Sequence, residues 1–281
     1  MLDKETGLES DPSTLRTIAE GLAADAAAFV RRRRAEVFGD GVEHPVRAKS
    51  TPTDPVTVVD TETERMLRDR LAELRPGEPI LGEEEGGSPN AVPGRPLWVL
   101  DPIDGTVNFV YGIEAYAVSV GVQVDGVSVA GAVANVPTGE VFSAAAGMGA
   151  HVRRGAMTSQ LRCTAVEDLS MALVGTGFGY ARERREEQAA VVARLLPEVR
   201  DLRRIGSCAL DLCMVAAGRL DAYYEDGVHV WDWAAAAVIA AEAGARLRLP
   251  SVDGSGSGLI VAAAPGVATA LDDALRRAGA A

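Results

Sequence analysis

The spacing of apolar residues along the chain predicts six helices. Apolar positions at steps of three and four residues predict a first helix over Ser13–Arg34. A second helix is expected to begin near Asp60 or Thr61, with Glu64 as the capping-box partner of Thr61, and to end before Pro76. The remaining helices are predicted over Glu183–Leu196, Ser207–Ala217, Trp231–Ala243 and Ala268–Ala278.

Short strands are predicted between these helices. Leu97–Leu100 has the pattern of a buried strand that ends at once in Asp101-Pro102. Three alternating segments separated by turn residues then predict an antiparallel meander: Ala115–Gln123, Val127–Val136 and Val141–Ala144. Shorter strands are expected at Pro79–Leu81, Ala172–Val174, Leu220–Glu225 and Leu259–Ala263. The order of elements indicates a mixed α+β class and differs from the strict alternation of a doubly wound parallel fold.

Composition and charge narrow the class of protein. The 281 residues suffice for one large domain or two closely packed ones, preceded by a flexible tail at 1–11. A net charge of −12 argues against nucleic-acid binding, and no apolar run is long enough to span a bilayer. The first residues lack the pattern of a signal peptide. The three cysteines have no metal or redox spacing and are expected as buried thiols in a reducing, cytoplasmic setting.

The segment Asp101-Pro102-Ile103-Asp104-Gly105-Thr106 carries the first candidate chemistry. It places two carboxylates on a turn at the end of a strand, beside a glycine that permits positive φ. Carboxylate oxygens suit a hard cation and free amide groups suit a phosphate, so the segment could be a metal and phosphate site. A turn stabilised by its own aspartates explains the segment equally well.

Other acidic residues stand at comparable junctions. The run Glu83–Glu85 follows a predicted strand, Asp60 precedes a helix and Asp232 begins one; a solvated loop and two helix caps are the structural explanations. Carboxylates that gather at one point need cations, and a set of oxygen ligands favours Mg²⁺. Lys49 is one of two lysines in the chain. Either a compact, flexible positive charge is needed at this position, or the lysine was retained by chance. Three scattered histidines argue against zinc: His44, His151 and His229.

Order and spacing of these motifs resemble the inositol monophosphatase family of Mg²⁺-dependent, lithium-sensitive phosphatases. The resemblance runs from about Leu15 to Leu275. Its motifs are Gly82-Glu83-Glu84, Asp101–Phe109, and Trp231–Ala235 followed by Glu242-Ala243-Gly244. The resemblance implies a layered α-β-α-β-α sandwich, one domain over 12–281 with halves near 12–150 and 151–281, and a homodimer.

The resemblance also implies a set of metal ligands. Glu83, Asp101 and the carbonyl of Ile103 would hold one Mg²⁺, and Asp101, Asp104 and Asp232 would hold a second. A third, weaker ion would depend on Glu83 and water. The family therefore implies two to three ions.

Further roles follow from the same resemblance. Gly105 and Thr106 would present backbone N–H groups to the phosphate, and Asp60 and Thr106 would polarise the attacking water. Lys49 would lie near the third ion.

The alcohol part of the substrate has its own implied residues. Glu225 would accept hydrogen bonds from ring hydroxyls, and Asp104, Ser207 and Cys208 would complete the pocket. The family often has alanine at the position of Cys208, which implies a slightly altered pocket here.

The implied activity is hydrolysis of myo-inositol 1-phosphate and related polyol or sugar monophosphates by direct attack of a metal-activated water. Within the family, histidinol-phosphate phosphatase, fructose-1,6-bisphosphatase and 3′-phosphoadenosine phosphatase are alternatives. A haloacid-dehalogenase-type phosphatase would need two aspartates separated by one residue after a strand, which the chain lacks. A regulatory role through a protein partner is the alternative of a different class.

Overall fold

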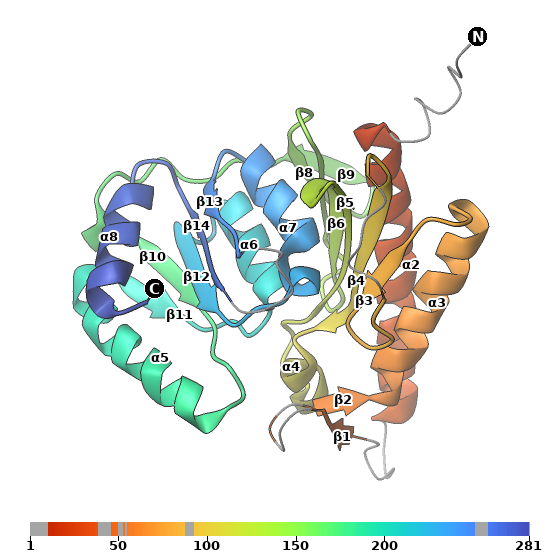
Figure 1. Cartoon of the computed structure of the whole chain (residues 1–281), viewed down its shortest axis with the longest axis horizontal. Helices are drawn as coiled ribbons and strands as arrows, with labels where there is room; N and C mark the ends of the chain where they lie inside the picture. The colour runs from red at the N-terminus through yellow and green to blue at the C-terminus, as the bar shows by residue number, and fades with distance from the viewer. Residues whose placement is uncertain are drawn as a thin grey trace.

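The computed structural model describes residues 11–38, 46–49, 53, 55–87, 93–250 and 258–280. Its helices are α2 (Pro12–Val37), α3 (Val58–Leu74), α4 (Thr106–Tyr111), α5 (Arg182–Leu195), α6 (Cys208–Ala216), α7 (Val230–Glu242) and α8 (Ala268–Ala278). Two sheets alternate with these helices in five layers (Figure 1). The outer layers are α2 with α3 on one side and α5 with α8 on the other, and α6 and α7 lie between the sheets. This is the predicted α-β-α-β-α sandwich.

The first sheet has seven strands in the order β3-β4-β5-β6-β7-β8-β9. Their bounds are β3 (Ile80–Gly82), β4 (Pro96–Asp104), β5 (Ala117–Val124), β6 (Val127–Asn135), β7 (Val141–Ala145), β8 (Ala150–Arg154) and β9 (Met157–Gln160). Only β3 and β4 pair in parallel, and every later pair is antiparallel. The predicted meander is therefore correct and continues for two strands more.

Strand β4 runs further than its sequence predicts. It does not stop at Asp101-Pro102 but continues to Asp104, and its pairing with β5 shifts register between Asp101 and Asp104. The shift falls at Pro102, which has no N–H to donate to a ladder. The irregular stretch turns the end of the strand so that both aspartates reach the same cleft.

The second sheet has the order β11-β10-β12-β14-β13. Its strands are β10 (Leu173–Thr176), β11 (Asp201–Arg203), β12 (Ala222–Asp226), β13 (Arg246–Arg248) and β14 (Leu259–Ala263). Strand β10 pairs in parallel with β11 and β12, which local patterns did not predict, and it continues for two residues beyond the predicted end at Val174. Two further strands, β1 (Val46–Ala48) and β2 (Pro55–Thr57), form a small antiparallel pair.

Two helix caps differ from their prediction. Helix α3 is capped by Thr57, with Asp60 as the third residue of the helix, and not by Asp60 or Thr61. Helix α7 is capped by His229, with Asp232 at the third position. In both cases the aspartate accepts a hydrogen bond from the cap residue's backbone N–H, because a capping box places its acid at the third residue of the helix.

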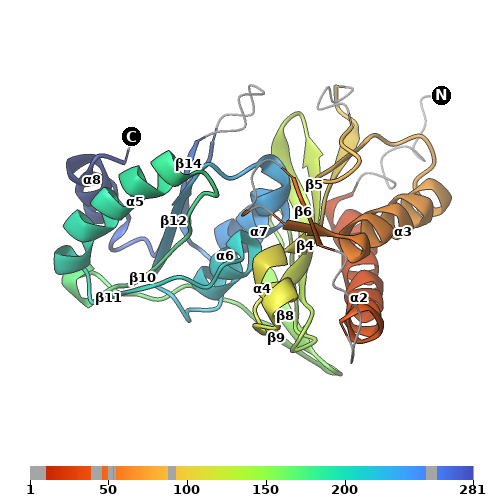
Figure 2. The ribbon, with the colours of Figure 1, turned by 90° about the horizontal axis from the view of Figure 1, so that it is seen from below.

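Helix α7 packs against the first sheet (Figure 2). Gly121 on β5 and Gly131 on β6 face it: a Cβ atom at Gly121 would lie 2.9 Å from the Ala235 nitrogen, and one at Gly131 would lie 2.6 Å from the Ala235 Cα. The absence of side chains at these glycines sets the spacing between the sheet and the helix that carries Asp232.

The remaining predictions concern the tail, the cysteines and the membrane. Residues 1–10 lie outside the described ranges, and Asp11, placed in the predicted tail, caps α2 by accepting a hydrogen bond from the Thr14 N–H. Cys208 and Cys213 are buried free thiols, while Cys163 is only half-buried. Within the described ranges, no helix has the length and apolar character needed to cross a membrane.

Candidate active site

A cleft of about 460 Å³ opens where the end of β4, the start of α4, α6 and α7, and the end of β12 meet. Ten of the twelve predicted site residues line it: Lys49, Glu83, Asp101, Ile103, Asp104, Gly105, Thr106, Cys208, Glu225 and Asp232. Asp60 and Ser207 are buried behind it, where Asp60 contacts Thr106 and Ser207 contacts Asp104. Segments that are distant in sequence are thus brought to one place.

Three carboxylates form the centre of the cleft. Asp101, Asp104 and Asp232 each offer one oxygen within 4.8 Å of the others. Each side chain also accepts a hydrogen bond that fixes it: Ile103 N donates to Asp101 at 3.0 Å, and His229 N donates to Asp232 at 2.5 Å. Asp104 accepts from Ser207 Oγ at 2.5 Å and Ala209 N at 2.7 Å. The carboxylates are therefore held in position by the protein itself.

These carboxylates are arranged to receive a cation. Burial, and then repulsion among neighbouring acids, raises the pKa of Asp101 and Asp232 well above the ordinary range, and burial raises the pKa of Asp104 to about 7. Among the described residues, no lysine or arginine lies within 4.0 Å of the three groups. Three gathered carboxylates without a lysine or arginine partner fit a hard divalent cation, which would neutralise them.

Glu83 stands beside this cluster and is not one of its three members. Its carboxylate pairs with Lys49 Nζ at 2.8 Å, and Lys49 also contacts Glu84 at 2.5 Å. Glu64 fixes the turn: its buried carboxylate accepts from Glu84 N at 2.7 Å and Glu85 N at 3.0 Å. The predicted role of Glu64 as a cap partner of Thr61 is wrong, because its oxygens are used here.

Asp60 supports Thr106 from behind. One Asp60 oxygen accepts from the Thr57 backbone N–H at 2.9 Å and the Thr57 hydroxyl at 2.5 Å, while the other lies 3.3 Å from Thr106 Oγ1. The Thr106 hydroxyl also lies 3.0 Å from the Ile103 carbonyl. Burial raises the pKa of Asp60 to about 6. The Thr106 hydroxyl is therefore oriented at the edge of the carboxylate cluster.

Gly105 turns the chain from β4 into α4. Its φ of 97° lies in the left-handed region, and a Cβ atom would come within 3.0 Å of the Ala115 carbonyl and 3.1 Å of the Gly206 carbonyl. The first N–H groups of a helix have no partner within the helix, and those of α4 begin at the cleft beside Asp104. The turn can thus present amide donors to an anion next to the cation site.

Comparison with known proteins agrees with this arrangement. The sequence profile of the Inositol monophosphatase family matches residues 11–278. The chain belongs to the inositol monophosphatase family. An inositol-1-monophosphatase of Mycobacterium leprae is 66% identical over 278 residues, covering 96% of each chain. Inositol monophosphatase 1 of Homo sapiens is 34% identical over 232 residues, covering 79% of this chain and 82% of that one.

Solved structures show the same fold. The structure of Mycobacterium tuberculosis SuhB has a TM-score of 0.84 and 61% identity, covering 96% of this chain and 99% of that one. An inositol monophosphatase from Anabaena has a TM-score of 0.79 and 30% identity, covering 94% and 96%. The resemblance inferred from the motifs, to a family of phosphatases with a layered α+β fold, is confirmed. The three-aspartate cluster is compatible with a metal-dependent member of this family.

The end of β12 forms the opposite side of the cleft in this family member. The Tyr223 hydroxyl donates to Glu225 Oε2, and the Cys208 thiol lies against the same hydroxyl. Gly177 leaves room for this arrangement, because a Cβ atom there would lie 1.9 Å from Glu225 Oε2. We call this group the β12 wall: Tyr223 and Glu225 of β12, together with Cys208 at the start of α6.

Sequence reasoning assigned no role to two residues that hold the site together. Asn108 donates from Nδ2 to the Ala115 carbonyl at 2.7 Å and to the Ile205 carbonyl at 2.9 Å, which ties α4 to the loop before α6. Tyr223 orients Glu225 from behind. Asn108 lies within the Asp101–Phe109 motif, and Tyr223 lies two residues before Glu225 and therefore on the same face of a predicted strand. These positions could have indicated a role in the site.

Proposed function

We propose that this protein is a Mg²⁺-dependent phosphomonoesterase that hydrolyses myo-inositol 1-phosphate and related polyol or sugar monophosphates. The observation that carries the proposal is the cluster of Asp101, Asp104 and Asp232 beside the amide groups at the start of α4. A cation site next to an anion site is what cleavage of a phosphate ester requires. Relatives named inositol-1-monophosphatase, at 65% and 66% identity, support this choice of substrate.

Two to three Mg²⁺ ions fit the available oxygens. Asp101, Asp104 and Asp232 would hold one ion, and Asp101 with Glu83 and the Ile103 carbonyl would hold another. When bound, the ions supply charge neutralisation for the phosphate and acidify water. A third ion would compete with Lys49 for Glu83, because the lysine occupies that carboxylate.

The chain's own groups bind, orient and move protons. The backbone N–H groups of Gly105 and Thr106 hold the phosphate oxygens. The Thr106 hydroxyl donates to Asp60, so Thr106 Oγ1 can take a proton from the attacking water while its own proton passes to the Asp60 carboxylate. The water oxygen bonds to phosphorus as the phosphorus–oxygen bond to the alcohol breaks, and the departing alkoxide takes up a proton from solvent. Glu225 accepts hydrogen bonds from ring hydroxyls and aligns the leaving alcohol, and Asp104, Ser207 and Cys208 complete that pocket. No covalent phosphoenzyme forms.

A panel of phosphomonoesters tests this proposal. Rates with myo-inositol 1-phosphate, histidinol phosphate, fructose 1,6-bisphosphate and 3′-phosphoadenosine 5′-phosphate should be measured with Mg²⁺ and with a chelator. We expect turnover only with Mg²⁺, inhibition by Li⁺ and a preference for the inositol ester. A preference for histidinol phosphate would overturn the assigned substrate, and trapping of a phosphoenzyme would overturn the direct attack. We also propose that the protein is a homodimer in the cytoplasm. Sedimentation of the purified protein tests the oligomeric state.

A regulatory role is the second candidate. A Nus factor SuhB of Pasteurella multocida is 36% identical over 248 residues, covering 83% of this chain and 88% of that one. That relative is named as a Nus factor, which supports a protein partner besides a small-molecule substrate. A pull-down with the wild type and the Asp104→Asn variant separates the two roles, because a scaffold would keep its partner when turnover is lost.

A further inference from the structure

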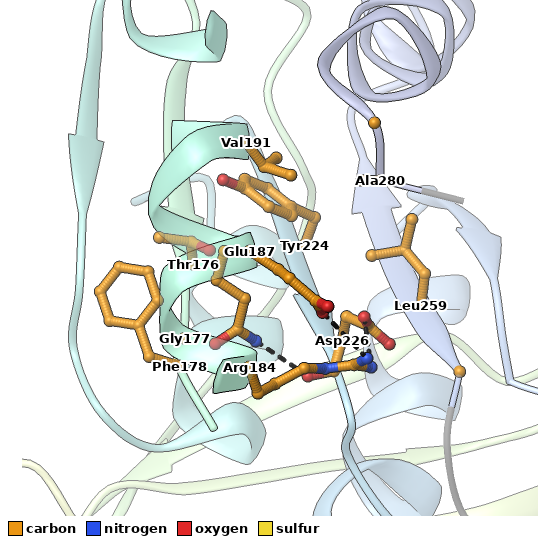
Figure 3. A pocket seen from close by; sticks show the side chains of 13 residues that line it. Thr176, Gly177, Phe178, Arg184, Glu187, Val191, Tyr224, Asp226, Leu259 and Ala280 are labelled. Atoms are coloured by element: carbon orange, nitrogen blue, oxygen red, sulfur yellow. Dashed lines mark hydrogen bonds and ion pairs between the residues drawn. The ribbon is translucent and has the colours of Figure 1, made fainter. Parts of the chain in front are cut away.

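A second cavity lies on the other side of β12. It has a volume of about 400 Å³ and is enclosed by α5, the ends of β10, β12 and β14, and the residues that follow α8 (Figure 3). Val191, Tyr224 and Leu259 give it apolar walls, and Thr176 lies beside Tyr224. Its volume is within the range of small-molecule sites. The proposed phosphatase reaction does not use it.

The cavity exists because α5 covers the sheet incompletely. Of the fourteen residues of this helix, only Leu195 at its end is buried. The first half of α5 is held near the sheet by polar contacts at its rim. Arg184 pairs with Asp226 at 2.5 Å, and Gln188 donates to the Asp226 carbonyl at 3.2 Å and accepts from Gly179 N at 2.9 Å. These contacts fix the helix above the apolar floor without filling the space beneath it.

One polar group inside this cavity lacks a partner. Tyr224 is 5% exposed, and among the described residues nothing meets the distance and angles of a hydrogen bond with its buried hydroxyl; the Thr176 side chain is near enough to oppose the rise in the pKa of Tyr224 that burial causes, but it does not meet that geometry. Buried hydroxyl groups in folded proteins nearly always have a hydrogen-bond partner. In Figure 3 the ring of Tyr224 lies beside Val191, and its hydroxyl points toward α5. A bound molecule could supply the missing partner.

The charges around the cavity restrict what can bind. Among the described residues that line it, Arg184 is the one basic residue, and it is paired with Asp226 and lies 3.7 Å from Glu187. The described lining therefore has a net charge of −1, which disfavours phosphates and carboxylates. The rings of Phe178 and Tyr224 are part of the lining, and aromatic rings pack favourably on one another, which favours an aromatic body.

We propose that this cavity is a second ligand site for an uncharged aromatic molecule with one hydrogen-bonding group, which would pair with the Tyr224 hydroxyl. The site is separate from the catalytic cleft. Successive residues of a strand face opposite sides, so Tyr224 faces the cavity while Tyr223 and Glu225 face the cleft. Phe178 and Asp226 border both spaces. A ligand in the cavity and a phosphate in the cleft can therefore be bound together.

Binding of 2-naphthol, followed by its fluorescence anisotropy on the full chain without substrate, tests the site directly. We expect saturable binding that inorganic phosphate with Mg²⁺ does not displace. The anion 2-naphthoate, which has the same ring system, should bind at least about tenfold more weakly because of the net negative lining. Since no turnover is measured, the result does not depend on the proposed function.

Three variants locate the binding. Val191→Trp should abolish binding by filling the cavity, whereas Ala190→Trp, at the neighbouring exposed position, should leave it unchanged. Tyr224→Phe removes one hydroxyl and should weaken binding by about tenfold. The proposal is overturned if 2-naphthol does not bind, if phosphate displaces it, or if Val191→Trp and Tyr224→Phe both bind as the wild type does.

Discussion

The two sides of the catalytic cleft differ in how the negative charge of their carboxylates is balanced. Asp101, Asp104 and Asp232 bring three acidic groups together, with no lysine or arginine of the described residues in contact. The β12 wall has a single carboxylate, Glu225, which receives a hydrogen bond from Tyr223 of the same strand. Burial raises the pKa of Glu225 as well, but its Tyr223 partner opposes that shift.

From this difference we expect the aspartate cluster to act in cleavage of the phosphate ester and the β12 wall to act in the choice of substrate. The aspartate cluster is incomplete without an external positive charge, so it should affect the cleavage of every phosphate ester. The β12 wall needs no cation, because Glu225 has a hydrogen-bond partner within the protein. Substitutions there should therefore lower the rate only for substrates whose alcohol carries hydroxyl groups. If the comparison is right, substitutions on the two sides will differ in which substrates they impair, and not merely in size.

The largest effect is expected from Asp104→Asn. An asparagine oxygen can still accept from Ser207 Oγ and Ala209 N, so the variant should fold, while the charge for the cation is lost. A cation is worth several kcal/mol in such a reaction, so kcat/KM should fall by roughly 10³-fold for myo-inositol 1-phosphate and for 4-nitrophenyl phosphate alike. Circular dichroism checks the fold, and full activity in the variant would refute the metal assignment.

Glu225→Gln should lower kcat/KM for one substrate much more than for another. A hydrogen bond to a charged acceptor contributes about 1.5–3 kcal/mol, so kcat/KM for myo-inositol 1-phosphate should fall by roughly 100-fold. With 4-nitrophenyl phosphate, whose alcohol offers no ring hydroxyls to this wall, the change should stay within about threefold. Equal losses on both esters would show that the β12 wall acts in the chemistry.

Removal of metal should make stability depend on pH. The folded-state pKa of Asp60 is about 6 and that of Asp104 about 7, both raised first of all by burial. Because these values exceed the unfolded ones, the folded state binds protons more tightly, and stability falls as pH rises from about 4 to 7. A shift of two units corresponds to about 2.7 kcal/mol.

Melting temperatures at pH 5 and pH 8 measure this effect. In a chelator the protein should melt at a lower temperature at pH 8, and Mg²⁺ should restore stability at pH 8 but have little effect at pH 5. Asp104→Asn, which lacks one of the titrating groups, should show a smaller drop. Equal melting temperatures of the chelated wild type at both pH values would contradict the electrostatic account.

The smallest effect is expected from Tyr223→Phe, with Tyr224→Phe as its matched control. Loss of the Tyr223 hydroxyl removes one hydrogen bond from Glu225, worth about 1 kcal/mol, so KM for myo-inositol 1-phosphate should rise by roughly fivefold with kcat nearly unchanged. Tyr224 faces away from the cleft, so its variant should keep wild-type kinetics. A loss confined to kcat would assign Tyr223 a role in the chemistry.

Local patterns predicted the elements well where one hydrophobic face decides the structure. Helix α2 and the meander from β5 to β7 follow directly from apolar spacing. The five-layer arrangement came from the motifs' resemblance to a family, because the parallel pairing of β10 with β12 joins segments about fifty residues apart. No local signal specifies which distant strands will pair.

The caps show a different limit. Thr57 with Asp60, and Thr61 with Glu64, both have an acidic residue three positions after a threonine. Only the tertiary structure distinguishes them, because Glu64 is used to hold the turn at Glu84 and Glu85. The same holds for the site: the motifs named the carboxylates, but the pairing of Glu83 with Lys49 requires the small sheet of β1 and β2 to be placed first.

The contact of α7 with Gly121 and Gly131 has a consequence for genetics. A single methyl group at either glycine would push against the backbone at Ala235, three residues after Asp232. Such an allele would shift a carboxylate it never touches, and nothing in its position along the chain would reveal why. A screen for inactive alleles should therefore recover two classes of mutation: one at the acidic residues, and one at glycines on the middle strands of a sheet.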